Sequence, residues 1–165
     1  SLAARADIQF VRTRDGRQLV FCNGKDVTEE IRDPIINQKV STVSSHPGVR
    51  TELIKKQREM ARNKNVVMDG RDIGTVVLPE AQYKFYLTAD LEERVRRRHR
   101  EMLDKGRQES YDLIRSDLEK RDRLDQSRAV GPLCPAPDSL IIDTTHATLE
   151  EVVNKILKVI KEGRG

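Results

Sequence analysis

Two acids and one base directly follow a short apolar run near the middle of the chain. In the string VVMDGRDIGT, residues 66–75, the charged residues are Asp69, Arg71 and Asp72, and Gly70 and Gly74 permit tight backbone turns. The apolar run predicts the end of a buried strand, and ligands of open α/β sheets bind just beyond the carboxyl ends of strands. We therefore predict the floor of a polar ligand site here. The alternative is a loop with surface charges.

A second group of charges lies on a helix predicted from Asp90 to the helix-breaking glycine at position 106. Its apolar face is formed by Leu91, Val95 and Met102. At about 100° per residue, Arg98 falls on this face and Arg94 lies at its edge. Such an arginine needs a partner, either a carboxylate from elsewhere in the fold or a phosphate, to which the guanidinium can donate two hydrogen bonds. The other arginines point elsewhere: Arg97 lies further round the helix, and Arg96 and Arg100 face solvent.

A third group lies on the next predicted helix, from Ser110 to about residue 127. Its inward stripe begins with the residues Tyr111, Ile114 and Leu118 and continues with Arg121, Asp125 and Arg128. One helix face therefore changes from apolar to ionic along its length. The stripe could be a ladder of structural ion pairs. We favour an anion site, in which the aspartate orients the two arginines at the edge of a polar cleft.

The elements that position these charges alternate in the second half of the chain. Strands are predicted at 84–88 and 139–143, with the two charged helices between them and a final, structural helix after them. Two helix starts carry the capping-box pattern, Asp90 with Glu93 and Thr148 with Glu151. This alternation predicts an α/β fold with a parallel sheet and flanking helices.

The first half of the chain has a different pattern, which resembles a small insert beside that sheet. Strands at 7–12 and 18–22 flank a turn signal and predict a hairpin, whereas residues 27–31 fit either a short strand or a helical turn. Residues 34–45 are ambiguous, although Pro34 suits the first turn of a helix, and a helix is predicted at 48–63. Arg50 lies in the first turn of this predicted helix, where a base opposes the helix dipole, and both a site role and a plain surface position remain open.

The composition limits the classes of protein to which the chain can belong. It has 165 residues, a net charge of +4 and 35% charged residues, which fits a single domain with a small insert and an anionic partner such as a nucleotide. No apolar run approaches the length of a membrane span. The two cysteines, Cys22 and Cys134, form no metal-type pair, so a reduced cytoplasmic setting is expected.

These motifs together resemble the bacterial cytidylate (CMP) kinase family. The resemblance rests on DGRDIGTVV at 69–77, on the arginines of the helix after Asp90, and on SRAV at 127–130 with the Arg-Asp pair at 121–122 and Asp125 before it. Shorter matches are Ile31-Arg32, Pro47, Val49-Arg50 and Gln57-Arg58. The resemblance covers essentially the whole chain, and the string Gly-Arg-Asp-Ile-Gly-Thr is highly specific to the family.

The resemblance implies a P-loop nucleoside-monophosphate-kinase-like fold. Residues 1–64 would form the small α+β insert that binds the nucleoside monophosphate (NMP). Residues 65–165 would form the C-terminal part of the kinase core, with a parallel sheet, flanking helices and an arginine-rich lid near 94–110. The implied activity is transfer of the γ-phosphoryl group of ATP, with Mg²⁺, to CMP or dCMP in the cytoplasm. The partners would be these nucleotides, with no membrane and no nucleic acid.

The resemblance also implies roles for individual residues. Catalytic contacts with phosphates would come from five arginines, Arg94, Arg97, Arg98, Arg121 and Arg128. The CMP-binding residues would be Ser41, Arg50, Arg71, Asp72 and Asp125, with Arg71 on a phosphate. Asp69 resembles the Walker-B-type carboxylate that positions Mg²⁺ through water.

The sequence departs from the family pattern in one respect. It contains no G-x-x-x-x-G-K-[ST] string, so the family's first strand and P-loop are absent from this chain. We therefore expect a truncated chain that is inactive or nearly so alone and that self-associates through exposed core surface. The alternative is a non-catalytic nucleotide- or nucleic-acid-binding module, although 4% aromatic residues disfavour a surface on which bases stack.

Overall fold

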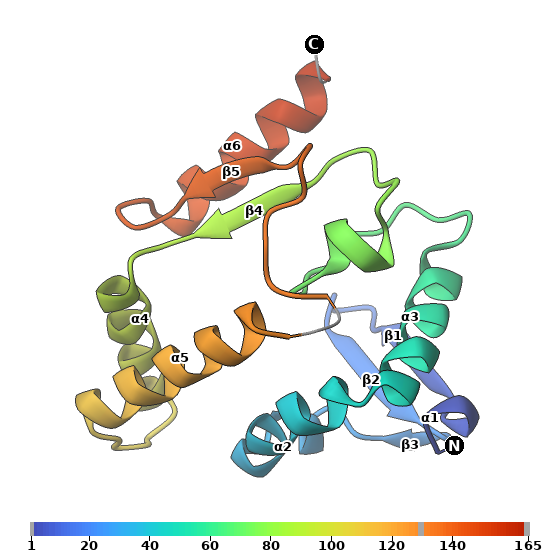
Figure 1. The fold of residues 1–165 in the computed structure, drawn as a ribbon, viewed down its shortest axis with the longest axis horizontal. Helices are drawn as coiled ribbons and strands as arrows, with labels where there is room; N and C mark the ends of the chain where they lie inside the picture. The colour runs from blue at the N-terminus through green and yellow to red at the C-terminus, as the bar shows by residue number, and fades with distance from the viewer. Residues whose placement is uncertain (1, 129–130, 164–165) are drawn as a thin grey trace. The chain divides into compact units, whose positions relative to one another are not determined.

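The computed structural model describes residues 2–128 and 131–163, apart from the side chains of Pro34, Asn37, Gln38, Ser41 and Ser45. The chain divides into two compact units, unit 1 (residues 1–66) and unit 2 (residues 67–165). Figure 1 shows the elements of both.

Unit 1 contains an antiparallel three-stranded sheet. Strands β1 (Ile8–Arg12) and β2 (Gln18–Cys22) form the predicted hairpin, with Phe10 opposite Val20. A two-residue turn then leads into β3 (Lys25–Asp26), with positive φ angles of 51° at Asn23 and 78° at Gly24. Asn-Gly is the pair that such a turn favours, because both positions need a left-handed backbone. The hairpin prediction is confirmed.

The helices of unit 1 include one that the sequence predicts, one at a segment that the sequence leaves ambiguous, and one that the sequence does not predict. A four-residue α1 (Leu2–Arg5) comes first, and a short 3₁₀ turn, η1 (Glu30–Arg32), settles the open choice at 27–31 in favour of a helical turn. Helix α2 (Pro34–Ser45) follows, capped by the Asp33 carboxylate, which accepts a hydrogen bond from the Ile35 amide. Both α1 and α2 pack against α3 (Pro47–Ala61).

Unit 2 is built on two parallel strands, β4 (Phe85–Thr88) and β5 (Leu140–Asp143), paired from Phe85 with Leu140 to Thr88 with Asp143. Helix α6 (Leu149–Glu162) follows β5 and lies beside it (Figure 1). It begins with the predicted capping box, in which the Thr148 hydroxyl and the Glu151 carboxylate each bind the other's backbone amide. The parallel strand pair confirms the predicted α/β class.

The two charged helices, α4 (Leu91–Asp104) and α5 (Tyr111–Gln126), pack side by side (Figure 1). The chain leaves α4 through Gly106, whose φ of +71° suits a residue without a side chain. The Gly106 amide donates to the Leu103 carbonyl and the Arg107 amide to the Met102 carbonyl, the pattern of a Schellman motif. The Ser110 hydroxyl then caps α5. Val95 and Ile114 are buried, as their helix faces predict.

Two local predictions are wrong. Residues Val66–Met68 form no strand, and Val67 is fully exposed, because a strand needs ladder partners and the described structure pairs none with this run. The capping box at Asp90 does not form: the Asp90 amide donates instead to the Thr145 hydroxyl, and Glu93 binds arginines.

The two glycines of the central string lie in a bend and in a short π-helical segment, η2 (Ile73–Val77), and neither has a positive φ. A Cβ on Gly70 would lie 2.8 Å from Cγ1 of Ile73, so a side chain there would force a shift. A Cβ on Gly74 would lie 3.4 Å from Cδ of Lys84, which is an ordinary contact distance.

Candidate active site

The centre of the candidate site is the Asp125 carboxylate, which is 1% exposed in the last turn of α5. Its Oδ2 accepts a hydrogen bond from Nε of Arg71 at 2.8 Å and lies 3.8 Å from Nε of Arg121. Its Oδ1 forms an ion pair with Nη2 of Arg128. We call Arg71, Arg121, Asp125 and Arg128 the arginine cluster. The structure thus brings together the ionic stripe of α5 and an arginine from 50 residues earlier in the chain.

The arginine cluster carries more positive than negative charge. Three guanidinium groups surround one carboxylate, so two positive charges remain uncompensated within the cluster. Burial lowers the pKa of Arg121, and the charges of Arg71, Arg128 and Arg98 lower it further, whereas Asp125 opposes the shift. A group with this charge arrangement attracts an anion, and guanidinium groups match the geometry of phosphate oxygens.

Two of the three arginines are open to solvent. The side chains of Arg71 and Arg121 are 43% and 49% exposed, whereas that of Arg128 is 15% exposed. Each of the exposed pair contacts Asp125 through Nε, so the outer nitrogens of both guanidinium groups can reach a ligand. Asp125 therefore orients the arginines, and the ligand would meet their outer edges.

The remaining charges of the central string lie close to Arg71 in the chain but differ from it in burial. Asp72 is buried, and its carbonyl accepts the Val76 and Val77 amides at the start of η2. Asp69 is exposed, and among the described residues no ion pair engages its carboxylate. Asp69 thus has free carboxylate oxygens, whereas Asp72 helps to shape the turn.

The arginines of α4 have separate partners. Nη1 of Arg94 pairs with Oδ2 of Asp122 on α5 at 2.7 Å, so a carboxylate from elsewhere in the fold supplies the partner that its helix face requires. Arg98 pairs with Glu101 of the same helix at 2.7 Å, and both side chains are more than one-third exposed. An exposed pair of this kind contributes about 0–1 kcal/mol, so Arg98 can leave Glu101 at little cost.

Arg97 makes contacts of a different kind. Nε donates to Oε1 of Glu93 at 2.9 Å, and Nη1 donates to the Thr144 hydroxyl at 3.2 Å. Nη2 donates to the Thr144 carbonyl and lies 3.5 Å from the Thr145 carbonyl. This guanidinium is therefore engaged with the segment that follows β5.

The sequence reasoning from residue types missed the partners in that segment and on α5. Thr144 and Thr145 follow directly on β5, and Asp122 was noticed only as part of the family pattern. The same signal that singled out residues 69–72, polar residues just after an apolar strand, was present at 143–145 and could have identified the two threonines.

Two predicted site residues belong to unit 1. Arg50 lies in the first turn of α3 and is only 9% exposed, which excludes the plain surface position. Ser41 lies in α2, but its side chain falls outside the described part of the chain. The Ala129-Val130 portion of the family motif also lies outside it.

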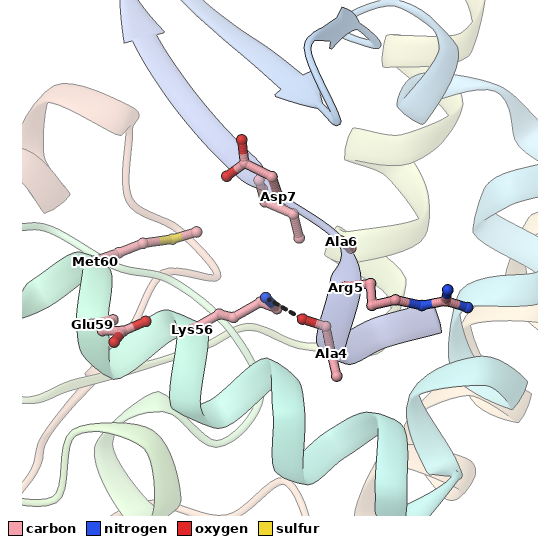
Figure 2. A pocket seen from close by; sticks show the side chains of 8 residues that line it. Ala4, Arg5, Ala6, Asp7, Lys56, Glu59 and Met60 are labelled. Atoms are coloured by element: carbon pink, nitrogen blue, oxygen red, sulfur yellow. Dashed lines mark hydrogen bonds between the residues drawn. The ribbon is translucent and has the colours of Figure 1, made fainter. Parts of the chain in front are cut away.

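A shallow cavity in unit 1, of about 400 Å³, involves none of the predicted site residues. Figure 2 shows that its wall includes the α1–β1 connection and the second half of α3, with the ammonium group of Lys56 donating to the Ala4 carbonyl at 3.1 Å. Both charge signs line it, Arg5 and Lys56 beside Asp7 and Glu59. The cavity thus lacks the charge excess that distinguishes the arginine cluster.

The described residues contain no group of three or more His, Cys, Asp or Glu side chains that could bind a metal ion by themselves. Mg²⁺ is commonly held by one or two carboxylates together with waters and substrate phosphates. The exposed Asp69 carboxylate fits that mode of binding. Among the helices that the structure describes, none is long and apolar enough to cross a membrane.

Comparisons with known proteins identify close relatives. The family model described as cytidylate kinase matches residues 1–162. The cytidylate kinase of Caldanaerobacter subterraneus subsp. tengcongensis is 52% identical over 161 residues, which cover 98% of this chain and 70% of the relative. That of Bacillus subtilis is 45% identical over 161 residues, covering 98% and 71% of the two chains. That of Desulforamulus reducens is 49% identical over 148 residues, covering 90% and 67%.

The structure is mixed α/β, with parallel strands and flanking helices, and the family model matches nearly the whole chain. The chain therefore has the fold of the P-loop nucleoside monophosphate kinases, a class of phosphotransferase enzymes. The predicted fold class and enzyme class are confirmed. Within that class the matches extend over nearly the whole chain at 45–52% identity. The chain belongs to the cytidylate kinase family.

Proposed function

We propose that this protein is a nucleoside monophosphate kinase that transfers the γ-phosphoryl group of ATP to CMP or dCMP, forming CDP or dCDP. The observation that carries the proposal is the arginine cluster, in which the buried Asp125 carboxylate orients three arginines that retain two uncompensated positive charges. The names of the relatives support the choice of substrate. Such a reaction belongs to pyrimidine nucleotide metabolism and would take place in the cytoplasm.

We assign the monophosphate of the acceptor nucleotide to the outer edges of Arg71, Arg121 and Arg128. Each can donate charge-assisted hydrogen bonds to phosphate oxygens. The nucleoside side of the acceptor would contact Ser41 and Asp72, with Arg50 and Asp125 nearby. Residues 1–64 would then serve as the NMP-binding insert, and residues 65–165 as the C-terminal part of the kinase core.

We assign Arg94 and Arg98, in a lid near residues 94–110, to the phosphoryl group in transfer. Phosphoryl transfer depends mainly on positioned charge around the group that moves. Arg98 suits this role because its contact with Glu101 is exposed and easily exchanged for a phosphate. Arg94 would act from a more fixed position, since Asp122 and the Ala89 carbonyl both hold it.

Asp69 is the residue that would hold Mg²⁺, through water, as the ion arrives with ATP. When bound, the ion neutralises charge on the phosphates of ATP. Asp69 fits this role because its carboxylate is exposed and, among the described residues, engaged by no cation. The chain places that carboxylate two residues before Arg71, which would bind the phosphate of the acceptor.

The binding part of the proposal can be tested on the 165-residue chain by titration with CMP, followed by NMR spectroscopy. We expect Arg121→Ala to weaken CMP binding by about 1–3 kcal/mol, the range for losing charge-assisted contacts. The matched control is Arg123→Ala, because Arg123 lies on the same helix, is exposed and forms no ion pair among the described residues. Cytidine, which has no phosphate, should bind equally to all three proteins. Equal CMP affinities would refute the phosphate assignment.

The catalytic part is tested by ADP release coupled to an indicator reaction, with ATP, CMP and Mg²⁺. The family's P-loop supplies the backbone amides and the lysine that hold the phosphates of ATP, and these 165 residues contain no such string. We therefore expect turnover when a P-loop segment from a relative is joined before Ser1 or added as a peptide, and little or none otherwise. A joined protein that bound CMP without forming CDP would refute the kinase assignment.

A further inference from the structure

Arg97 differs from its neighbours on α4 because the structure engages all of its guanidinium nitrogens. Its contacts run to the Glu93 carboxylate, to the Thr144 hydroxyl and carbonyl, and to the Thr145 carbonyl. Two of these acceptors are backbone carbonyls, which stay where the strand places them. A planar fork of five donors on three nitrogens can reach these spread acceptors at once, whereas an ammonium group offers three donors from a single nitrogen.

The segment that accepts these hydrogen bonds is itself held rigidly. The Thr144 amide and hydroxyl both donate to the Thr88 carbonyl, at 2.8 and 2.9 Å, which joins the ends of β5 and β4. The Thr145 hydroxyl donates to the Asp143 carboxylate and accepts the Asp90 amide at the start of α4. Both threonines are buried, at 8% and 9% exposure. Arg97 therefore binds a fixed point of the sheet.

Because the contacts of Arg97 hold it in place, they also determine the direction in which the next residue, Arg98, projects from α4. Neighbouring residues on a helix are about 100° apart, so rotation of α4 about its axis would turn Arg97 and Arg98 together. Arg98 follows Arg94 by one turn of α4, and Arg94 is held at 2.7 Å by Asp122, the neighbour of Arg121 on α5. At this position the charge of Arg98 also lowers the pKa of Arg121. The orientation of α4 thus decides whether Arg98 adds its charge to the phosphate-binding side of the cluster.

We propose that Arg97 is a positioning residue: it fastens α4 to the end of β5 and thereby directs Arg98 toward the arginine cluster, without contacting the phosphate itself. This inference rests on the proposed function in one respect, namely that the arginine cluster, toward which Arg98 is directed, binds phosphate. It replaces, for Arg97 alone, the catalytic contact that the family resemblance implied.

The anchor is tested without any ligand, by amide hydrogen exchange of the 165-residue chain. Arg97→Ala should speed exchange in the first two turns of α4 by about tenfold or more, because a local opening then breaks fewer contacts. Arg97→Lys should behave like the alanine variant, since one ammonium group cannot replace the fork. The control is Arg100→Ala, because Arg100 is exposed on α4 and forms no ion pair among the described residues. Unchanged exchange in both Arg97 variants would overturn the anchor.

The action through Arg98 is tested by a double-mutant cycle with inorganic pyrophosphate as the probe, measured by calorimetry at low salt. We expect Arg97→Ala and Arg98→Ala each to weaken binding about threefold or more, and the double variant to be no weaker than Arg98→Ala alone. A merely structural role would leave binding unchanged in Arg97→Ala. A direct phosphate contact would make the two losses add and would let Arg97→Lys recover affinity. Either result would overturn the proposal.

A substitution at the opposite end of the contact covers the case in which Arg97→Ala fails to fold. Glu93→Gln removes the charge that holds Nε of Arg97, together with the exposed pair of Glu93 with Arg96, and leaves the contacts of Arg97 with Thr144 and Thr145 in place. Glu93→Gln should give a smaller effect in the same direction in both experiments. If it changed neither the exchange rates nor pyrophosphate binding, that result would count against the proposal. A wild-type chain that bound neither pyrophosphate nor CMP would refute the phosphate-site proposal instead, while the exchange experiment would still decide whether Arg97 anchors α4.

Discussion

Removal of the Asp125 carboxylate has two opposite effects on the arginine cluster, and their balance can be estimated. In Asp125→Ala, Arg71, Arg121 and Arg128 lose their common partner. Each charge-assisted hydrogen bond contributes about 1.5–3 kcal/mol, but contacts of half-exposed groups contribute less because water replaces them. Arg128, at 15% exposure, is the member that water compensates least. We therefore expect the unliganded protein to lose about 1–3 kcal/mol of stability.

The same substitution removes a negative charge near the bound phosphate. At a separation of about 7 Å and an effective dielectric constant of about 40, this repulsion is worth about 1 kcal/mol per unit of phosphate charge, or about 2 kcal/mol for the dianion, so its removal favours binding. The loss of fixed arginine geometry costs about 2–4 kcal/mol when one or two charge-assisted contacts are misplaced. The net expectation is weaker CMP binding by up to about 2 kcal/mol, or a Kd up to about 30-fold higher.

CMP affinity is measured by calorimetry or NMR titration at fixed low salt, and stability by thermal unfolding without ligand. Asp117→Ala is the matched control, because Asp117 is exposed on α5 and forms no ion pair in the described part of the chain. Asp125→Asn keeps the side-chain volume and should fall between wild type and Asp125→Ala. CMP binding that is unchanged or tighter in Asp125→Ala would mean that charge removal dominates, and that Asp125 does not position the arginines.

Three further outcomes follow from the structure. In a version joined to a P-loop segment, Arg98→Ala should lower kcat at least about tenfold, and Arg100→Ala should change it little, because Arg98 is half-buried on the inner face predicted for α4 and Arg100 is exposed. Gly70→Ala should destabilise the chain by about 1–3 kcal/mol in chemical unfolding, because its Cβ would lie 2.8 Å from Cγ1 of Ile73. Hydrogen bonds from the Thr145 hydroxyl and amide lower the pKa of Asp143 below its usual 3.8, so its stabilisation should be present above about pH 4 and lost on further acidification.

Each of these three has a control and a contrary result. If Arg98→Ala and Arg100→Ala lost equal amounts of kcat, the position of an arginine on the inner or outer face of α4 would have no bearing on catalysis. Gly48→Ala should be neutral or stabilising, since a Cβ there meets nothing within 4 Å. An equally harmful change at Gly48 would remove the steric explanation for Gly70. If Asp143→Asn lost stability in acid as steeply as wild type, another carboxylate would be responsible.

Local rules predicted most elements of the fold because the signals lie within a few residues of each other. The Asn23-Gly24 turn, the Gly106 helix end and the Thr148 cap all follow from backbone preferences of single residues. The ionic stripe of α5 follows from helix periodicity alone. These predictions needed no knowledge of which segments meet in space.

The predictions that failed depended on partners from distant parts of the chain. The run Val66–Met68 has strand-like residues, but a strand exists only with a neighbour to pair with. Glu93 has the spacing of a capping residue, but the Asp90 amide that it would bind donates to the hydroxyl of Thr145, 55 residues further along the chain. The position of Arg71 against Asp125 is likewise invisible to spacing: the helix face alone predicted an anion site at Asp125, and only the family resemblance placed Arg71 on a phosphate.

The charge excess of the arginine cluster also couples nucleotide binding to protons. A phosphate monoester loses its second proton near pH 6, so CMP changes from a monoanion to a dianion in that range. Two uncompensated positive charges are neutralised by the dianion and only half neutralised by the monoanion. The bound phosphate should therefore have a lower second pKa than free CMP, and the cluster should expel that proton when it captures nucleotide below pH 6. The observed binding enthalpy would then depend on the ionisation enthalpy of the buffer. The slope of that dependence would measure the number of protons released for each CMP bound.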